Sequence, residues 1–491
     1  MLISHERVLK KRRDGYTHDI LFGYNFIVFM KSAPITIIVP AVCAVLALAA
    51  LGFWLAGGRA AQPFALRVPG QDLPVNPAQA AIDLKGVFTK STGTPADLPG
   101  LWPGFRGPGL DGVSRETARL ARSWGPDGPR ELWSVEMGEG YAGPAVRNGR
   151  VYVLDYDQEN RLDVLRCLSL ADGQEIWRRA YPVKVKRNHG MSRTVPAVSD
   201  QYVVTLGPKC HVLCVDADTG DYRWGIDLVR EYGTKVPAWY AGQCPLIDGD
   251  RVILAPGGDA LMIAVDAASG EVLWKTPNPR GWPMSHSSIM PMTFNGRRMY
   301  VYCAEGGVAG VAPEDGRILW ETSEWRIKIA TIPTPIPLAN GCILLVGGYN
   351  AGSMMLQLTE QDGQITAKPL FRLRANQFSS DQQTPILYKD HVYGVIQGGQ
   401  LVCIDLQGKV KWTSGSQRFG LGPYIIADGM LYLINDSGTL TLAEATPAGY
   451  RQLAQARVLH GHDAWGPPAI AGGRLLVRDL TRMVCLDVGV R

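Results

Sequence analysis

The sequence predicts an all-β protein: an eight-bladed β-propeller of four-stranded blades, closed by an N-terminal strand and preceded by one transmembrane helix. The first observation is a recurring turn, clearest where Asp216, Thr219 and Gly220 precede Trp224. Hairpin turns of this kind need Gly for its positive φ, and Asp or Thr for hydrogen bonds to the turn backbone. The second is a Pro that opens an apolar run in every unit. A repeat of about 40–50 residues is typical of a propeller blade.

The composition fits a folded protein built from many short strands. Of the 491 residues, 46% are hydrophobic and 19% are charged, and there are 56 Gly, 33 Pro and 13 Trp. These values exclude a disordered chain. The net charge of +5 is modest for this length, and the sequence has no basic stripe with interleaved aromatic residues. It therefore predicts no nucleic-acid partner.

The nine cysteines include no Cys-x-x-Cys motif and no adjacent pair. Four of them, Cys167, Cys214, Cys403 and Cys485, occupy similar places in the repeat. Small buried cysteines commonly act as core-filling apolar residues. The cysteines are therefore interpreted as packing residues, and no metal site is predicted from them.

Residues 35–56 contain no charged side chain and are predicted to be a transmembrane anchor. A helix of about 22 residues is about 33 Å long, which is enough to cross the apolar core of a bilayer. The positive-inside rule then makes residues 1–34 a cytoplasmic tail and places the rest on the periplasmic or extracytoplasmic side of the inner membrane. The charges behind this assignment precede the segment at Lys10, Lys11, Arg12, Arg13 and Lys31, and follow it at Arg59 and Arg67.

Two alternatives concern this N-terminal region. Gly58-Arg59-Ala60 could serve as a small-residue cleavage site, which would make the apolar segment a removed signal peptide. Met30-Lys31 followed by an apolar run also resembles the start of an export signal. Residues 1–29 would then come from a misassigned start codon, and recovery of a peptide from them by mass spectrometry would refute this hypothesis.

Residues 57–100 are rich in Pro and Ala without a sustained period, which predicts an extended linker. The propeller domain is assigned to residues 101–491. Its opening segment, Trp102–Ser114, is irregular and rich in Gly and Pro, and it is expected to lie across one face of the domain.

The two markers agree on eight units. Six tryptophans are spaced through the repeat as structural docking residues, and Thr366 and Leu453 fill the two missing places. Pro is tolerated at the first residue of a strand, where no ladder donor is yet needed. The docking residues are Trp133, Trp177, Trp224, Trp274, Trp320 and Trp412, and the prolines are Pro144, Pro196, Pro245, Pro291, Pro335, Pro385, Pro423 and Pro468.

The two ends of the repeat complement each other. The first unit supplies only a Trp strand, Arg130–Val135, whereas the last unit ends at Cys485–Val488 and lacks one. The N-terminal strand is therefore predicted to complete the last blade. Such closure leaves only short, protected sheet edges.

The recurring Asp216-x-x-Thr219-Gly220-x-x-x-Trp224 phrase resembles the tryptophan-docking motif of the quinoprotein-type (PQQ-like) eight-bladed propellers. The segment Trp102–Ser114 is similar to the lead-in of many exported bacterial members. The resemblance covers about residues 100–489. That family includes pyrroloquinoline-quinone-dependent alcohol dehydrogenases and a non-enzymatic outer-membrane assembly lipoprotein, so the resemblance implies the fold far more strongly than an activity.

The chain departs from both branches of this family. The quinone enzymes carry a disulfide between adjacent cysteines and a calcium ion held by Glu and Asn near a catalytic Asp. This chain has no adjacent cysteines, and no motif places those calcium ligands. The lipoprotein carries a lipidated Cys, where this chain has an apolar segment. The sequence is therefore interpreted as closer to the non-enzymatic members, with no cofactor expected.

Functional side chains are expected in the loops just before the eight prolines, because these loops converge on one mouth of the central channel. The loop Lys184–Arg193 could bind a carboxylate, a phosphate or an acidic partner, or be a solvated charged loop. The loop Trp239–Gln243 offers a stacking surface or aromatics that plug the channel. The candidates in these two loops are Lys184, Lys186, Arg187, His189, Arg193, Trp239, Tyr240 and Gln243.

Two further loops carry titratable groups. Asp381 could act as a base or a cation ligand, or simply cap a turn. Two histidines lie beside a carboxylate in the loop before Pro468, which raises a metal site as one hypothesis, although no ligand set is assigned. The candidates here are His286, Asp381, Gln382, His460, His462, Asp463 and Trp465.

Three functions follow from these candidates. The first is a membrane-anchored, exported scaffold that binds envelope proteins or peptides without catalysis. The second is a pyrroloquinoline-quinone-dependent dehydrogenase for an alcohol or sugar, with Trp239 against the quinone, Asp381 as base and Ca²⁺ nearby. The third is a sugar- or metal-sensing module.

Overall fold

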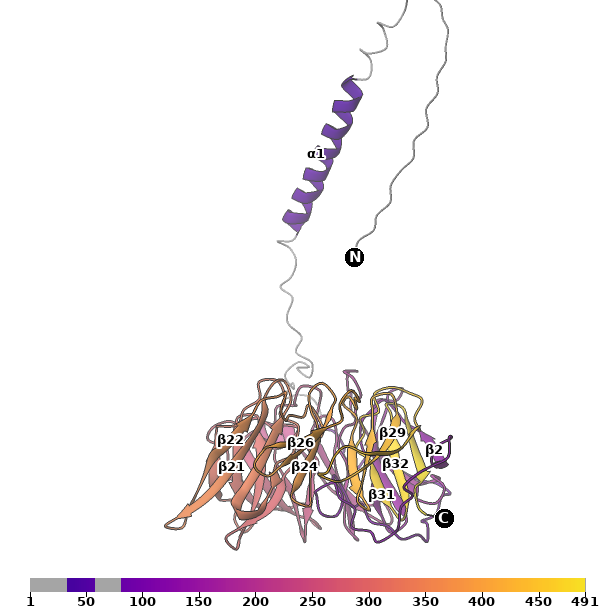
Figure 1. Ribbon diagram of the computed structural model, residues 1–491, viewed down its shortest axis with the longest axis vertical. Helices are drawn as coiled ribbons and strands as arrows, with labels where there is room; N and C mark the ends of the chain where they lie inside the picture. Colours follow the sequence, from indigo (N-terminus) through magenta and orange to yellow (C-terminus); the bar gives the residue numbers. More distant parts are fainter. Residues whose placement is uncertain (1–32, 58–80, 491) are drawn as a thin grey trace, which may run out of the picture. The chain divides into compact units, whose positions relative to one another are not determined.

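The computed structural model describes residues 33–57 and 81–490. The chain divides into two compact units, Met1–Arg67 and Val68–Arg491. The first unit contains the helix α1 (Ala33–Gly57), drawn in indigo in Figure 1. Among the described residues, no helix combines the length and the apolar character needed to cross a membrane. The predicted span 35–56 falls on α1 and is not shown to be transmembrane.

Most of the other N-terminal predictions lie outside the described residues. These are the cytoplasmic tail up to residue 32, the alternative start at residues 1–29, the cleavage site at residues 58–60 and the first part of the linker.

The second unit is the predicted eight-bladed propeller, formed by eight antiparallel sheets (Figure 1). Four-stranded blades are confirmed for seven sheets, whereas the first has a fifth strand. The first strands of neighbouring blades contact one another, so these strands are the inner ones that surround the channel. The blades pack face to face through buried apolar side chains.

The strands of blades 1–4 are β3 (Ala145–Arg147), β4 (Arg150–Asp157), β5 (Leu162–Ser169) and β6 (Glu175–Pro182); β7 (Ala197–Val198), β8 (Tyr202–Leu206), β9 (His211–Asp216) and β10 (Tyr222–Asp227); β11 (Leu246–Asp248), β12 (Arg251–Leu254), β13 (Ala260–Asp266) and β14 (Val272–Pro277); β15 (Met290–Phe294), β16 (Arg297–Ala304), β17 (Gly307–Val311) and β18 (Ile318–Thr322). A short helix, α2 (Leu228–Tyr232), follows β10.

The strands of blades 5–8 are β19 (Ile336–Pro337), β20 (Cys342–Gly347), β21 (Gly352–Gln361) and β22 (Gln364–Leu373); β23 (Ile386–Tyr388), β24 (His391–Val395), β25 (Leu401–Asp405) and β26 (Val410–Thr413); β27 (Tyr424–Ala427), β28 (Met430–Ile434), β29 (Thr439–Glu444) and β30 (Gln452–Arg457); β31 (Ala469–Ala471), β32 (Arg474–Arg478), β33 (Arg482–Asp487) and β2 (Arg130–Glu136). A 3₁₀ turn covers Ala339–Gly341.

The eight prolines mark the inner strands as predicted. Seven of them stand directly before the first residue of the inner strand, and Pro291 is the second residue of β15. The ring also closes as predicted, because β2 pairs antiparallel with β33. In this pairing Trp133 lies opposite Cys485, and Ser134 lies opposite Val484. The first propeller strand thus completes the last blade.

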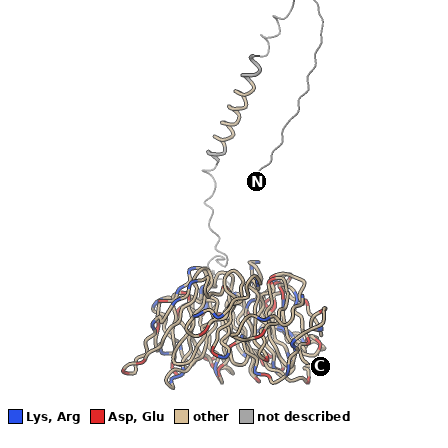
Figure 2. Tube along the Cα trace, in the orientation of Figure 1, with Lys and Arg blue, Asp and Glu red and all other residues tan. Residues whose placement is uncertain are grey.

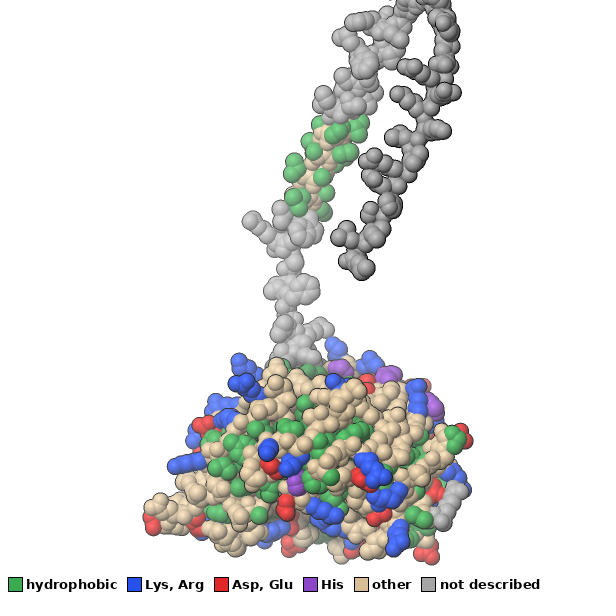
Figure 3. Space-filling view, in the orientation of Figure 1, with side chains coloured by type: hydrophobic (Ala, Val, Ile, Leu, Met, Phe, Trp, Pro, Cys, Tyr) green, Lys and Arg blue, Asp and Glu red, His purple; other side chains and the backbone are tan. Residues whose placement is uncertain are grey.

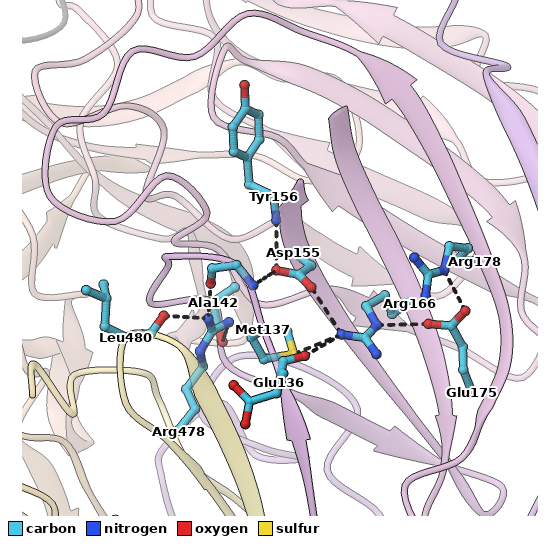
Figure 4. Close-up of polar contacts among 11 residues, drawn as sticks. Glu136, Met137, Ala142, Asp155, Tyr156, Arg166, Glu175, Arg178, Arg478 and Leu480 are labelled. Carbon is cyan, nitrogen blue, oxygen red and sulfur yellow. Dashed lines mark hydrogen bonds and ion pairs between the residues drawn. The ribbon is translucent and has the colours of Figure 1, made fainter. Parts of the chain in front are cut away.

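The polar contacts in Figure 4 hold the chain where β2 leaves the closing blade. The guanidinium of Arg478, in β32, is fully buried and donates to the carbonyl oxygens of Ala142 (3.2 Å), Gly138 (3.0 Å) and Leu480 (3.2 Å). The Gly138 N–H donates to the carboxylate of Asp155, in blade 1, at 2.7 Å. These bonds tie blade 8 to blade 1 at the point where the ring closes.

A second arginine extends this junction in blade 1. Arg166 bridges two carboxylates, Asp155 at 3.1 Å and Glu175 at 2.9 Å, and it also donates to the Glu136 carbonyl at 2.9 Å (Figure 4). All three charged side chains are largely buried, so each needs the others as partners. The end of β2 is therefore held by side chains of both joined blades.

The predicted linker 57–100 extends too far. Val87–Lys90 forms β1, which pairs antiparallel with β6 as the fifth strand of blade 1. The Leu84 side chain just before it is buried in the core. Composition missed this strand because all four of its residues are exposed, so it has no apolar alternation.

Five of the six tryptophans donate their indole N–H to a carbonyl in the turn of the next blade. This bond, together with the packing of the ring on that turn, links each blade to its neighbour. The donor and acceptor pairs are Trp133 to Leu170 (3.1 Å), Trp177 to Asp218 (3.2 Å), Trp224 to Ala267 (2.9 Å), Trp274 to Pro313 (2.9 Å) and Trp412 to Thr446 (2.9 Å).

Blade 5 breaks the pattern because its outer hairpin is longer, with ten residues in each of β21 and β22. The ladder continues where the docking turn would be, so the indole of Trp320 instead lies 3.2 Å from the sulfur of Met299, in its own blade. Phe371, not Thr366, occupies the docking place of blade 5. It stands directly after the register shift in β22, and its ring lies against Gly408 of blade 6.

The assignment in blade 7 shifts by one residue. Ala454 pairs with Leu442 directly after the register shift in β30, so it occupies the place predicted for Leu453. The small side chain of Ala454 cannot reach the next blade as an indole does. The two gaps in the tryptophan series thus hold Phe371 and Ala454.

The turn glycines are expected to be needed for space as well as for backbone angle. Gly270 has φ +76°, and a methyl group added there would lie 2.7 Å from the ring of Trp224. Gly249, in the same blade, has φ +63° but no atom within 4 Å of that position. Gly249→Ala should cost about 1–2 kcal/mol of unfolding free energy from backbone strain alone. Gly270→Ala should cost a further ~1–3 kcal/mol from overpacking, and equal losses in urea titrations would refute the docking role.

The segment Trp102–Ser114 enters the channel from one end and contacts inner strands on several sides. Trp102 is buried and exchanges backbone hydrogen bonds with Val146 of blade 1. Pro103 accepts a bond from Val198 of blade 2, and Ser114 donates to Ile426 of blade 7. These partners lie near the turns that follow the inner strands, so the segment, here named the plug, enters from the end opposite the loops that precede those strands. Through Arg106 it reaches as far as Thr384, at the end of one of those loops.

Candidate functional site

The loops before the inner strands, here named the mouth loops, surround the end of the channel opposite the plug. The turns between the second and third strands of each blade open on the same end, because antiparallel strands alternate in direction. In Figure 1 the turn joining β21 and β22 points to the lower left, so the mouth loops lie along the upper edge of the propeller. The mouth loops are residues 137–144, 183–196, 228–245, 278–289, 323–335, 374–385, 414–423 and 458–468.

The loop 183–196 is fixed on both sides by neighbouring loops. On one side, the Tyr141 N–H donates to the Ser192 carbonyl at 2.6 Å, and Arg187 pairs with Glu139 at 2.5 Å. On the other side, the Tyr240 hydroxyl donates to the Lys186 carbonyl at 2.5 Å. This loop, which the sequence singled out for its cations, is therefore held between two other mouth loops, 137–144 and 228–245.

Arg193 extends from this loop toward the channel. Its guanidinium lies 5.0 Å from the ring centre of Tyr141, in a cation–π arrangement. Burial lowers the pKa of Arg193 to about 10, while three tyrosines act on it in the opposite sense: Tyr141, Tyr240 and Tyr349. These tyrosines come from different blades, so the guanidinium lies where their loops converge.

The other cations and the histidine of this loop, Lys184, Lys186, Arg187 and His189, are exposed. Figure 2 shows Lys and Arg positions along the upper edge of the propeller, and Figure 3 shows Lys, Arg and His side chains there. Exposed like charges around a concave opening raise the local concentration of anionic groups. The rim of the mouth is therefore suited to an acidic partner.

Some side chains of the loop around Trp239 and Tyr240 are buried and hold its backbone in place. Gln243 is fully buried, and its amide pairs with the backbone of Ala255, accepting from the N–H at 2.9 Å. Tyr240 is buried as well, whereas Trp239 is half-buried. Of the three predicted residues, Trp239 presents the most surface to a ligand.

His286 is buried beside this loop. A methyl group added at Gly242 would lie 2.7 Å from its ring, so the two loops approach closely. Burial, followed by the positive charge of Arg193, lowers the pKa of His286 to about 4. The imidazole is therefore neutral at physiological pH and cannot balance an anion.

Asp381 lines a pocket of about 190 Å³ together with Arg418 and with residues of blade 6 and of the mouth loops before blades 6 and 7. Its carboxylate accepts a long hydrogen bond, 3.4 Å, from the Tyr349 N–H. Burial raises the pKa of Asp381 above its ordinary value, and the bond from Tyr349 only partly offsets this. Gln382, the next residue, is half-buried.

The polar residues of the loop before Pro468 bond to neighbouring loops. The Tyr141 hydroxyl donates to Asp463 at 3.1 Å, and the Trp465 indole donates to Asp436 at 2.8 Å. The rings of Tyr141 and Trp465 lie 5.1 Å apart. His460 and His462 are exposed. Within residues 33–57 and 81–490, no three His, Cys, Asp or Glu side chains come together as metal ligands.

Several mouth residues adopt a backbone conformation that side chains rarely accept. Left-handed φ values in residues other than Gly cost energy and concentrate at ligand-binding sites. The affected residues here are His189, Trp239, Tyr240, Tyr349, Asn350 and Asp463.

Sequence reasoning missed three residues of the mouth: Tyr141, Tyr349 and Arg418. Tyr141 and Arg418 each stand outside any cluster of charged or aromatic residues before a proline, so the sequence pattern does not mark them. Tyr349 lies in the turn between β20 and β21, not in a loop before a proline. The pair Tyr349-Asn350 after two glycines could have signalled an exposed, strained turn.

The residues present do not fit the quinone and calcium group of the dehydrogenases. All nine cysteines are free, so no disulfide covers the channel. Asp381 has Tyr349 and Arg418 around it, and Arg418 is a cation where a calcium ion would need further oxygen ligands.

A family profile described as outer membrane protein assembly factor BamB matches residues 161–414. No curated protein sequence matches the chain. Among solved structures, BamB from Moraxella catarrhalis is 14% identical, with a TM-score of 0.50 over 73% of this chain and 99% of that one. A europium-containing methanol dehydrogenase is 12% identical, with a TM-score of 0.56 over 79% and 90%.

Both structural likenesses are too distant in sequence to show more than the shared fold. The family profile covers just over half of the chain, and it agrees with the resemblance drawn from the tryptophan motif. The chain therefore belongs to the PQQ-like repeat propeller family of the outer membrane protein assembly factor BamB.

Proposed function

We propose that this protein is a non-catalytic scaffold that binds a polypeptide partner at the mouth of its propeller. The family match to an outer membrane assembly factor carries the proposal. The geometry supports it, because the plug enters the channel from one end and the mouth loops converge at the other. Loops on a rigid scaffold are where binding sites are usually built.

The proposed location is the cell envelope. The uncharged segment 35–56 and the basic residues before it support a single-pass anchor in the inner membrane, with the propeller on the periplasmic side. The tail 1–34 would then be cytoplasmic, and the residues before β1 would connect the anchor to the domain. Protease treatment of intact spheroplasts should digest the propeller and spare the tail, and the reverse pattern would refute this orientation.

Site-specific photo-crosslinking tests the binding face in the native host. A photoreactive residue at Asn376, exposed in a mouth loop, is compared with one at Glu314, exposed in a turn on the plug side. The full-length chain should form a discrete protein adduct from position 376 and none from position 314. Adducts from position 314 alone, or equal adducts from both, would contradict a binding mouth.

The dehydrogenase is retained as a second candidate for one reason. Asp381 combines a raised pKa with a pocket, and these are the properties of a general base. Pyrroloquinoline quinone with Ca²⁺, added to the purified protein, should give neither dye reduction with alcohols or sugars nor a thermal shift. Either response would favour the enzyme over the scaffold.

A further inference from the structure

Arg193 is a cation at the convergence of the mouth without an acidic partner. Arg187, six residues earlier, pairs with Glu139, but among the described residues no carboxylate forms an ion pair with Arg193. One guanidinium nitrogen donates to the carbonyl of Asn188 at 3.2 Å, whereas Nε is buried and has no acceptor. The half-buried charge is thus held with no carboxylate of the described residues to neutralise it.

Two neighbours in the same loop are also incompletely bonded. The Nδ2 of Asn188 and the hydroxyl of Ser192 are buried and have no hydrogen-bond partner. Both groups can donate, as can Nε of Arg193. Three unused donors within six residues leave this part of the mouth short of acceptors.

An unpaired buried cation is costly, and a bound anion would offset the cost. Arginine is also the side chain best suited to a carboxylate, because its planar guanidinium can donate two parallel hydrogen bonds. We propose that Arg193 binds a carboxylate group of the polypeptide partner in the mouth. This inference rests on the proposed scaffold function and names the group that the scaffold recognises.

The surroundings favour a singly charged carboxylate over a phosphate. Asp381 and Arg193 both act electrostatically on Tyr349, so a carboxylate lies in the same part of the mouth, and it would repel a multiply charged anion. The wall around the guanidinium is aromatic, with Tyr141 beneath it, and His286 is neutral. The exposed cations of the rim would draw an acidic segment toward this point without pairing with it individually.

Three fluorescent peptides of equal length test the proposal on the full-length protein at about 0.15 M salt. One has glutamates and an amidated C-terminus, one is neutral with a free C-terminus, and one is neutral and amidated. Fluorescence anisotropy should show binding of the first or the second at least about tenfold tighter than binding of the third. Tighter binding of the first peptide would assign the site to a side-chain carboxylate, and tighter binding of the second would assign it to a chain terminus.

Two variants separate Arg193 from the general charge of the rim. Arg193→Gln should weaken the carboxylate peptide at least about tenfold, whereas Lys184→Gln, which removes one exposed rim charge, should weaken it less than about threefold. Arg193→Lys should weaken binding by an intermediate factor, because lysine keeps the charge but cannot donate two parallel hydrogen bonds. Equal weakening by Arg193→Gln and Lys184→Gln would overturn the proposal, as would equal binding of all three peptides.

A thermal measurement guards against misfolding. Because the charge of Arg193 is unpaired, Arg193→Gln should keep or raise the Tm of the free protein, and only the wild type should gain Tm with the carboxylate peptide. A gain of the same size in both proteins would overturn the proposal. If position 376 forms protein adducts but peptide binding does not depend on a carboxylate, only this inference fails. If position 376 forms no adducts, the proposed scaffold function fails as well.

Discussion

Replacing Arg106 with Met is expected to lower the free energy of unfolding by at least about 4 kcal/mol. Its guanidinium donates to four carbonyl oxygens: Leu110 (3.0 Å), Asp111 (2.9 Å), Thr384 (2.8 Å) and Pro385 (3.0 Å). Leaving a buried acceptor without its donor costs about 1–3 kcal/mol, and Met can donate to none of them. Urea unfolding of the full-length chain, followed by fluorescence, measures the loss.

Arg115→Met is the matched control within the same segment. Arg115 also bonds Asp111, but through the carboxylate at 2.5 Å, and 59% of its side chain is exposed. An exposed ion pair contributes little, so the loss should stay below about 1 kcal/mol. If Arg106→Met cost no more than Arg115→Met, the plug would be a surface strap and the channel would not depend on it.

Replacing Asp163 with Asn is expected to remove a large pH dependence of stability. Asp163 is fully buried in blade 1; one carboxylate oxygen accepts from the Tyr181 hydroxyl at 2.5 Å, and the other has no partner. Burial raises the pKa of Asp163 from 3.8 to about 7. The folded protein therefore holds a proton that the unfolded chain releases between about pH 4 and pH 7.

The sign follows from that difference. Because the folded state binds more protons in this window, the stability of the wild type falls as pH rises through it, by about 4 kcal/mol from this group. Relative to wild type, Asp163→Asn should gain stability by about this amount between pH 4 and pH 8. Asp157→Asn is the control, because hydrogen bonds from Asn160 lower the pKa of this exposed carboxylate and give the opposite slope. A flat difference for Asp163→Asn would contradict the burial.

The fold was predictable because its markers are local and repeated. A turn glycine with positive φ and a proline before each inner strand are visible in the sequence, and the complementary ends gave the pairing of β2 with β33. The exceptions arose where tertiary contacts outweigh the repeat. The longer hairpin of blade 5 moves the docking position from Thr366 to Phe371. The sequence pattern does not reveal β1, because all its side chains face solvent.

The candidate site was predictable only in part. Charge density pointed to the loop of Arg193, and position before a proline pointed to Asp381. The sequence could not show which cation of that loop lacks a partner, because Glu139, which pairs with Arg187, lies in another mouth loop. Nor could the sequence show that Tyr349 lies near Arg193, since their proximity depends on how the blades curve into a closed propeller.

Amide hydrogen exchange of the full-length chain, alone and saturated with the protein captured through position 376, tests the binding mouth most directly. Exchange should slow in the mouth loops 183–196 and 228–245, and it should stay unchanged in the turns on the plug side. Slowing on the plug side, or along the outer edges of the blades with the mouth loops unaffected, would contradict the proposal.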